Sequence, residues 1–328
     1  MAWSLADLAG QEEVLARLNR EFAAGRMAHA YMLEGARGTG KTTMARGMAA
    51  RLFCLSPDSN GFACGACRPC LLLAHGNHPD YLELPRDPAE LRIGRFVERS
   101  GGTEHVEHQP LLPFLRLKPV EGGWRVAVIP DAERMRQESA NAFLKTLEEP
   151  PGRTLIILTV NTRDLLPATV ASRCRRVGIR PLSPEALAGE LERRGAASGA
   201  DARELARTAE GSLGMALELS SGEVLEYWRW LTGEAFANPG AASAQELADA
   251  WLAYGTGGGD NAGKRRNALA ALDLAALALR ARLRAGLDPD KGASALAALW
   301  TAGDQITRNV RPDLALLSGA FEVMAALR

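Results

Sequence analysis

One short segment restricts the fold of this chain more than any other. Residues 35–42 read Gly-Ala-Arg-Gly-Thr-Gly-Lys-Thr and fit the pattern G-x-x-x-x-G-K-S/T at every fixed position. An apolar segment, residues 30–33, precedes it, and a segment of helical character, residues 42–53, follows it. A phosphate-binding loop requires this context, because its curled glycine backbone turns several N–H groups toward one phosphate. The alternative is an accidental glycine-rich turn, which the complete pattern disfavours.

The loop predicts a site for ATP and Mg²⁺. Lys41 would place a positive charge on the terminal phosphates, Thr42 would offer its hydroxyl to Mg²⁺, and the next helix would add its N-terminal dipole. Asp131 follows an apolar segment, residues 126–129, and suits the Mg²⁺ shell at a neighbouring strand end. The residues expected at the nucleotide are Gly35, Arg37, Gly38, Thr39, Gly40, Lys41, Thr42, Thr43 and Asp131.

The position after Asp131 argues against efficient hydrolysis. Related ATPases place a glutamate there to activate water, whereas this chain has Ala132, which cannot accept a proton or orient a water. Glu133 lies one position further on, and on a strand end that changes its direction. The sequence therefore predicts nucleotide binding with weak or absent hydrolysis. Rescue by Glu133 stays open as the alternative, at the cost of a displaced geometry.

Four of the five cysteines lie close together, in the spacing C-x9-C-x2-C-x2-C. Thiolates at such spacing match a structural, tetrahedral Zn²⁺ site, and a site with four protein ligands has no open position for substrate. Two disulfides are the alternative, which a cytosolic chain disfavours. The predicted ligands are Cys54, Cys64, Cys67 and Cys70. Cys174 stands alone and reads as a small, buried apolar residue.

Apolar segments alternate with helical ones through the first half of the chain. The predicted strands are residues 30–33, 81–84, 126–129 and 154–158. Such continuous apolar strands between helices predict an α/β fold whose parallel sheet is covered on both faces. Beyond about residue 180 only helical patterns occur, beginning where Ser183 can cap a helix that has Pro184 at its first position.

Net charge and hydropathy indicate where in the cell the protein is expected to work. Lys plus Arg and Asp plus Glu number 39 each, so the net charge is zero, and DNA contact would need a local patch or a partner. No apolar run approaches the roughly 20 residues of a membrane span. The first residues lack a signal-peptide pattern. We therefore expect a cytoplasmic protein with no membrane partner.

Several segments together resemble one family. Residues 8–11 read LAGQ, residues 29–31 read HAY, residues 141–151 read NAFLKTLEEPP and residues 172–174 read SRC. With the phosphate loop and the four-cysteine insert, these segments resemble subunits of the bacterial DNA polymerase III clamp loader, in the AAA+ superfamily. The resemblance covers most of residues 8–176.

The resemblance implies a domain plan. Residues 1–180 would form an AAA+ P-loop domain with a parallel sheet and an inserted zinc module at 51–73. Residues 181–222 would form a small helical lid, and residues 223–328 an all-α collar for oligomerisation. The sequence of the collar segment agrees with the family but does not identify it. Its only signal is the helical spacing of Leu269, Leu272, Ala276, Leu279 and Leu283.

The resemblance also implies a function. Clamp-loader subunits form a ring-like heteropentamer of gamma/tau-type motor subunits with a delta and a delta-prime subunit, which opens a sliding clamp and places it on primed DNA. ATP lies between neighbours, and the arginine of Ser-Arg-Cys reaches the next subunit's ATP in trans. Here that catalytic residue is Arg173. Without the triplet, Arg173 would read as an ordinary surface charge.

Two departures suggest the type of subunit. Ala132 replaces the catalytic glutamate, and Gly214 stands where motor subunits, which resemble Gly-Ser-x-Arg-Asp-Ala, place an arginine on their own ATP. Both losses affect the chain's own site, whereas Arg173 is retained. The pattern is therefore most like the delta-prime subunit. An active gamma-type ATPase that uses Glu133 is the alternative, and a different P-loop enzyme, such as a small-molecule kinase, would leave the triplet unexplained.

Overall fold

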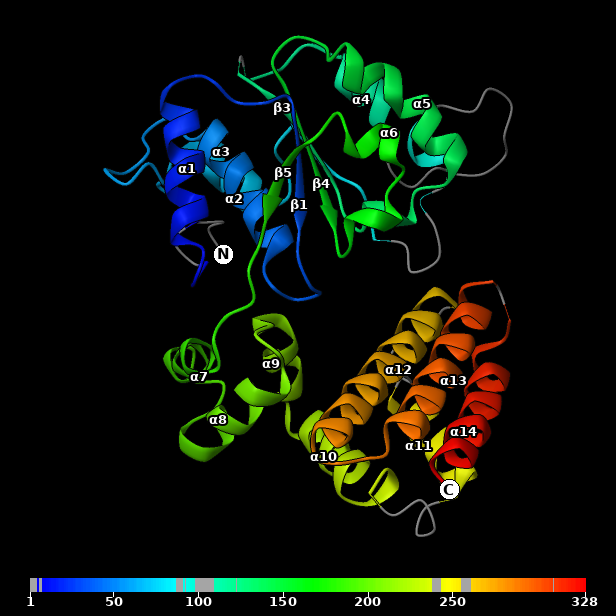
Figure 1. The fold of residues 1–328 in the computed structure, drawn as a ribbon. Coiled ribbons are helices and arrows are strands. Elements are labelled where there is room, and N and C mark those ends of the chain that lie inside the picture. Colours follow the sequence, from blue (N-terminus) through cyan, green and yellow to red (C-terminus); the bar gives the residue numbers. More distant parts are fainter. Residues whose placement is uncertain are drawn as a thin grey trace. The chain divides into compact units, whose positions relative to one another are not determined.

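Short apolar segments form a five-stranded parallel sheet in the computed structural model of the chain (Figure 1). The strands lie in the order β2-β3-β4-β1-β5, and Tyr31 of β1 is opposite Ile157 on one side and Arg175 on the other. Their bounds are β1 (Ala30–Glu34), β2 (Tyr81–Glu83), β3 (Arg125–Ile129), β4 (Thr154–Val160) and β5 (Arg175–Gly178). Because all are parallel, their carboxyl ends meet at one edge of the sheet.

The structure describes most of the chain and divides it into two units. Unit 1 is Met1–Ala216 and unit 2 is Leu217–Arg328. The described residues are 5, 8–86, 91, 93–97, 109–121, 123–237, 243–254, 261–308 and 310–328.

Helices cover both faces of the sheet in unit 1 (Figure 1). Successive strand side chains point to opposite faces, so Tyr31 and Leu33 join one core while Ala30 and Met32 join the other. The first core packs against α1 (Glu12–Ala23), α2 (Lys41–Phe53) and α3 (Arg68–Ala74). The second packs against α4 (Leu111–Arg116), α5 (Gln137–Glu148) and α6 (Ala168–Ala171).

Three helices follow the sheet, namely α7 (Pro184–Arg193), α8 (Gly199–Thr208) and α9 (Leu213–Leu219). The Ser183 hydroxyl accepts a hydrogen bond from the Ala186 N–H at 3.2 Å and caps α7, as predicted. Leu187 and Leu191, one turn apart on α7, are both buried.

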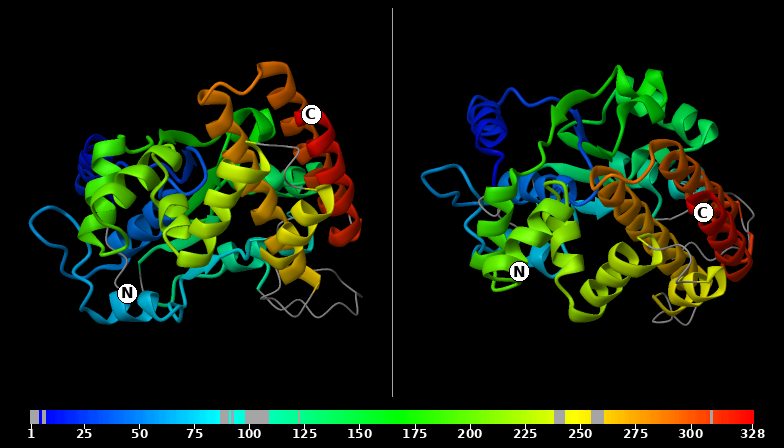
Figure 2. Two further views of the ribbon diagram at one scale, coloured as in Figure 1. Left: turned by 90° about the horizontal axis from the view of Figure 1, so that it is seen from below. Right: turned by 60° about the horizontal axis from the view of Figure 1, so that its bottom comes forward.

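Within the described residues of unit 2, the regular secondary structure is helical. Its helices α12, α13 and α14 run side by side, coloured yellow-orange to red (Figures 1 and 2). Trp251 is fully buried, and a Cβ atom on Gly319 would lie 2.8 Å from the Ala302 Cβ, so small residues let two helices approach closely. The bounds are α10 (Gly222–Trp230), α11 (Ala244–Tyr254), α12 (Asn261–Arg284), α13 (Pro289–Thr307) and α14 (Pro312–Leu327).

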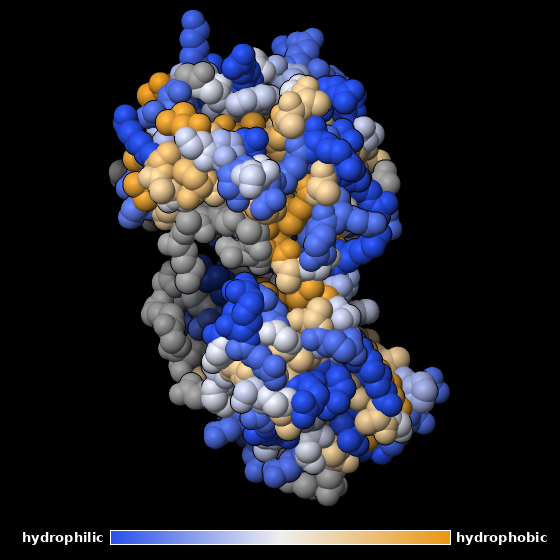
Figure 3. All heavy atoms as spheres, turned by 90° about the vertical axis from the view of Figure 1, so that its left-hand side faces the viewer, coloured by the Kyte–Doolittle hydropathy of each residue, from blue (hydrophilic) through white to orange (hydrophobic). Residues whose placement is uncertain are grey.

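The predicted parallel α/β sheet is confirmed, with one strand more than expected. Strand β5 reads Arg-Arg-Val-Gly, and of these residues only Val177 is buried, so its apolar signal was too weak to find. Hydrophilic side chains dominate the face drawn in Figure 3, with apolar ones in small groups. Among the described helices, none is long and apolar enough to cross a membrane.

Candidate functional site

The phosphate loop leaves the carboxyl end of β1 and leads into α2. Gly38 has a φ of +75° and Gly40 a φ of +98°, which glycine adopts without the strain that a Cβ atom would cause. Gly40 is also the N-cap of α2, so the backbone N–H groups of the first turn face the loop. Thr39 closes the loop, because its hydroxyl donates to the Ala36 carbonyl at 2.8 Å. This is a cradle of the kind that holds phosphate.

Lys41 is folded back into the loop. Its ammonium group donates to the carbonyls of Gly35 (2.7 Å) and Ala36 (2.9 Å) and to Asn161 Oδ1 (2.8 Å). The residue is only 6% exposed, and burial lowers the pKa of its amine from 10.5 to about 8. A phosphate would have to draw the ammonium group away from these three acceptors.

Glu133 is hydrogen-bonded to Asn161, the residue that follows β4. One carboxylate oxygen of Glu133 accepts from the Asn161 backbone N–H (3.0 Å) and from its side-chain amide (2.6 Å). This fixes the amide so that its oxygen faces Lys41. Sequence reasoning missed Asn161, although a polar residue directly after a continuous apolar strand was the signal that could have found it. The residue before Glu133, Ala132, is fully buried.

The two residues predicted for Mg²⁺ do lie together, but a third residue joins them. Arg86 Nη2 donates to Thr42 Oγ1 at 2.5 Å, and its Nη1 lies 3.9 Å from Asp131 Oδ2. Asp131 has a φ of +49°, which turns the chain sharply after β3. The backbone of the loop is therefore shaped for a phosphate, whereas Thr42 and Asp131, the residues predicted for Mg²⁺, are engaged by the side-chain cation of Arg86.

The first turn of α9 lies on the phosphate loop within unit 1. The Gly214 N–H donates to the Gly38 carbonyl at 2.9 Å. A Cβ atom on Gly214 would lie 2.9 Å from Gly38 Cα, and one on Gly38 would lie 2.2 Å from Ser212 Oγ. The backbones meet so closely that neither glycine can carry a side chain in this arrangement.

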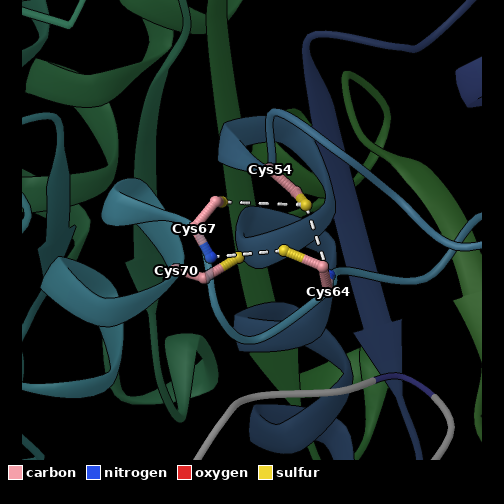
Figure 4. Close-up of side chains that lie close together, drawn as sticks. All are labelled: Cys54, Cys64, Cys67 and Cys70. Carbon is pink, nitrogen blue, oxygen red and sulfur yellow. Dashed lines mark hydrogen bonds between the residues drawn. The ribbon is translucent and has the colours of Figure 1, made fainter.

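The four clustered cysteines turn their side chains toward one another (Figure 4). Cys54 follows the last residue of α2 and Cys70 lies on α3, while Cys64 and Cys67 come from the loop between these helices. All four sulfur atoms lie within 4.8 Å of one another. Tetrahedral zinc with bonds of about 2.3 Å sets sulfur atoms about 3.8 Å apart, so the cluster fits a metal ion of that kind.

Backbone N–H groups already point at these sulfur atoms. The Cys64 N–H donates to Cys54 Sγ and the Cys67 N–H to Cys64 Sγ, each at 3.3 Å. Hydrogen bonds from the backbone N–H groups of Ala66 and Cys67 lower the pKa of the Cys64 thiol to about 6. Such bonds stabilise the thiolate, which is the form that binds metal.

Arg173 lies just after α6, where the chain turns into β5. Its Nη2 donates to Glu148 Oε1 at 2.5 Å and its Nη1 to the Thr169 carbonyl at 2.9 Å. Its side chain is 35% exposed. The neighbouring Cys174 is partly buried against the core, and burial raises the pKa of its thiol to about 12. In the triplet, Cys174 is therefore packed against the core, whereas the side chain of Arg173 is accessible.

With this geometry established, comparison with known proteins identifies the family. The family model described as DNA polymerase III, delta subunit, matches residues 10–183, more than half of the 328 residues. The chain belongs to this family. The phosphate loop, the cysteine cluster and Arg173 all lie in the matched segment.

Three curated relatives match parts of the chain. DNA polymerase III subunit delta' of Pseudomonas aeruginosa is 40% identical over 147 residues, which are 45% of this chain and 42% of that protein. Subunit delta' of Escherichia coli is 33% identical over 208 residues, 63% and 59% of the two chains. Subunit tau of Escherichia coli is 32% identical over 222 residues, 66% and 32% of the two. This chain spans less than two thirds of each relative.

The structure gathers the predicted residues into separate places. Lys41, Thr42 and Asp131 lie together at the carboxyl edge of the sheet, whereas Thr43 is exposed. The cysteines form their own cluster between α2 and α3. Arg173 pairs with Glu148, the last residue of α5, and not with any predicted residue of the chain's own phosphate loop.

Proposed function

We propose that this chain is a delta-prime-like subunit of the DNA polymerase III clamp loader in the cytoplasm. It takes part in ATP-dependent loading of the sliding clamp onto primed DNA, in a heteropentamer with gamma/tau-type motor subunits and a delta subunit. Its role is to donate Arg173 to the ATP of the adjacent motor, while its own site hydrolyses ATP weakly or not at all. One observation carries the proposal: Glu133 is engaged with Asn161, while Arg173 is accessible and held by surface contacts.

The engagement of Glu133 supports weak hydrolysis. A general base must lie within hydrogen-bond reach of the water that it activates, and one oxygen of Glu133 already accepts two hydrogen bonds from Asn161. Ala132, at the position of the usual base, is buried and carries no polar group. Gly214 offers only a backbone N–H to Gly38, so it supplies no charge to a terminal phosphate. The chain's own site thus lacks two of the groups that motor subunits use.

The surroundings of Arg173 support a role in trans. Its pair with Glu148 is an exposed one, and such pairs contribute only about 0–1 kcal/mol, so the guanidinium can leave it at little cost. A guanidinium is always charged and can bridge two phosphate oxygens, which a lysine cannot do in the same way. Arginines supplied in trans accelerate phosphoryl transfer by about 10³–10⁵.

The test is clamp loading by a reconstituted complex that contains Arg173→Ala. We expect normal assembly with slower ATP-dependent loading, and Arg173→Lys should recover only part of the rate, because it restores charge without the fork. Arg153→Ala, at an exposed arginine in the loop before β4, is the matched control and should load normally. Unchanged loading by Arg173→Ala would refute the role in trans.

The alternative is an active gamma-type motor, which one observation favours. The second carboxylate oxygen of Glu133 is buried and has no hydrogen-bond partner among the described residues, so it has the capacity to accept a hydrogen bond from a water that enters the site. Steady-state ATP turnover by the purified chain separates the two functions. Turnover comparable to that of a motor subunit, lost in both Glu133→Gln and Lys41→Ala, would favour the motor.

The cysteine cluster is proposed to hold one structural Zn²⁺. Cys54, Cys64, Cys67 and Cys70 would supply all four ligands, which leaves no position for a substrate or a reactive water. The ion would tie the end of α2 to α3 and so fix the loop between them.

A further inference from the structure

We propose that Arg86 takes the place of Mg²⁺ in this chain's nucleotide site, so that the phosphate loop binds a metal-free nucleoside triphosphate. The proposal rests on one part of the proposed function, namely that the loop receives a nucleotide. It goes further by stating that the ligand is the metal-free nucleotide and not its Mg²⁺ complex, and that Arg86 makes this selection.

The position of Arg86 follows from the order of the strands. Strand β2 pairs with β3, and both run in the same direction, so Arg86 and Asp131 leave the sheet at the same edge. Arg86 follows the end of β2 by three residues, and Asp131 follows the end of β3 by two. Arg86 is therefore brought to the phosphate loop across 44 residues of sequence, where it donates to Thr42 Oγ1 at 2.5 Å.

One guanidinium group reaches both residues that a P-loop normally offers to the metal. The Thr42 hydroxyl accepts from Nη2, and Nη1 lies 3.9 Å from the Asp131 carboxylate. A magnesium ion shared by these oxygen atoms would need near-octahedral coordination at about 2.0–2.1 Å. A permanently charged guanidinium in the same space uses a lone pair of Thr42 and repels a second cation. A metal ion could bind Thr42 and Asp131 only after Arg86 had moved away.

Arg86 also prepares the site for an anion. Its charge opposes that of Asp131, which would otherwise repel phosphate oxygens at the mouth of the loop. A guanidinium has five N–H donors, and its side chain here is 55% exposed, so donors remain that can turn toward a triphosphate. Lys41 alone is a poor first contact, because it is buried and bonded to two carbonyls of its own loop and to Asn161.

The test compares nucleotide affinity with and without metal. The full chain would be titrated with a fluorescent ATP analogue, once in excess Mg²⁺ and once in EDTA, with anisotropy as the readout. For the native chain we expect dissociation constants that agree within about threefold. For Arg86→Ala, which opens Thr42 and Asp131 to a cation, binding should be about tenfold or more weaker in EDTA than in Mg²⁺.

Two further variants separate the possible causes. Arg86→Lys keeps a charge and should stay less dependent on Mg²⁺ than Arg86→Ala. Arg116→Ala removes an exposed arginine at the end of α4 and should behave like the native chain. Circular dichroism of each variant shows whether it is folded, and the native comparison tests the proposal even if Arg86→Ala does not fold.

Two results would overturn the proposal. The first is a native affinity that falls about tenfold or more in EDTA, because that would place a metal ion in the site. The second is an absence of nucleotide binding by the native chain in either buffer. Neither result touches the role of Arg173, which is measured by clamp loading and requires no nucleotide in this chain's own site.

Discussion

Removing the carboxylate of Asp80 should destabilise unit 1 strongly. Asp80 directly precedes β2 and is 1% exposed. Its two oxygen atoms accept from the backbone N–H groups of Val120 (2.8 Å) and Glu121 (2.9 Å). Its nearest cation is Arg125, whose Nη2 lies 3.5 Å from Oδ1 and whose side chain is 4% exposed. Both charges are therefore buried and paired.

The size of the effect follows from the partner that is left behind. Arg125 would keep its bonds to the carbonyls of Leu117 (2.6 Å) and Lys118 (2.7 Å) and its position over the Phe114 ring. Its charge, however, would be buried without a counter-ion. Breaking a buried pair on one side costs about 3–5 kcal/mol, so we expect a loss of this size for Asp80→Ala. Asp80→Asn combined with Arg125→Met removes both charges and should recover much of the loss.

Hydrogen exchange provides the assay, because it reads unit 1 separately from unit 2. The Val126 N–H of β3 donates to the Asp80 carbonyl, and its protection reports how often this edge of the sheet opens. Denaturant unfolding followed by circular dichroism gives the overall free energy. A loss below about 1 kcal/mol for Asp80→Ala would refute the reasoning. So would a double variant whose loss of stability equals the sum of the losses measured for Asp80→Asn and Arg125→Met alone.

Three further outcomes are expected. Metal analysis should find about one zinc per native chain and per Cys174→Ser chain, but little in Cys67→Ser, and equal metal in all three would contradict the site. Because burial lowers the pKa of Lys41 from 10.5 to about 8, unfolding takes up a proton between these values. The stability of unit 1 should thus rise with pH across that window, by at most about 3 kcal/mol, and Lys41→Met should flatten the rise. Asn161→Ala removes one of three acceptors of a buried ammonium group and should cost about 1.5–3 kcal/mol in denaturant unfolding.

Sequence reasoning succeeded where one continuous segment held the whole signal. The phosphate loop carries its own pattern, and strand β4 is buried along its full length and is mostly apolar, because both faces of the sheet are covered. The grouping of the cysteines was equally local, since all four lie within residues 54–70, and the structure brings their sulfur atoms together. The division of the later helices into a lid and a collar came from resemblance alone and stays a prediction.

The residues that sequence reasoning missed owe their contacts to the pairing of neighbouring strands, which no single segment of the sequence reveals. Arg86 reaches Thr42 only because β2 lies beside β3, and the order of strands in a sheet cannot be read from spacing. The bond between Asn161 and Glu133 likewise joins the ends of two neighbouring strands. The sequence placed Glu133 one position off the expected base, but it could not reveal that the carboxylate already had a partner.

The anchoring of Cys174 beside Arg173 has a mechanical consequence. Backbone bonds from the Arg173 N–H to the Val170 carbonyl and from the Cys174 N–H to the Ala171 carbonyl tie this turn to α6, while the Cys174 side chain packs into the core. These contacts hold the backbone at Arg173 in place, so the guanidinium can change position by rotation about its own side-chain bonds. Its reach is therefore set by the length of one arginine, so under the proposed role in trans a neighbouring subunit would have to bring its phosphate within that distance.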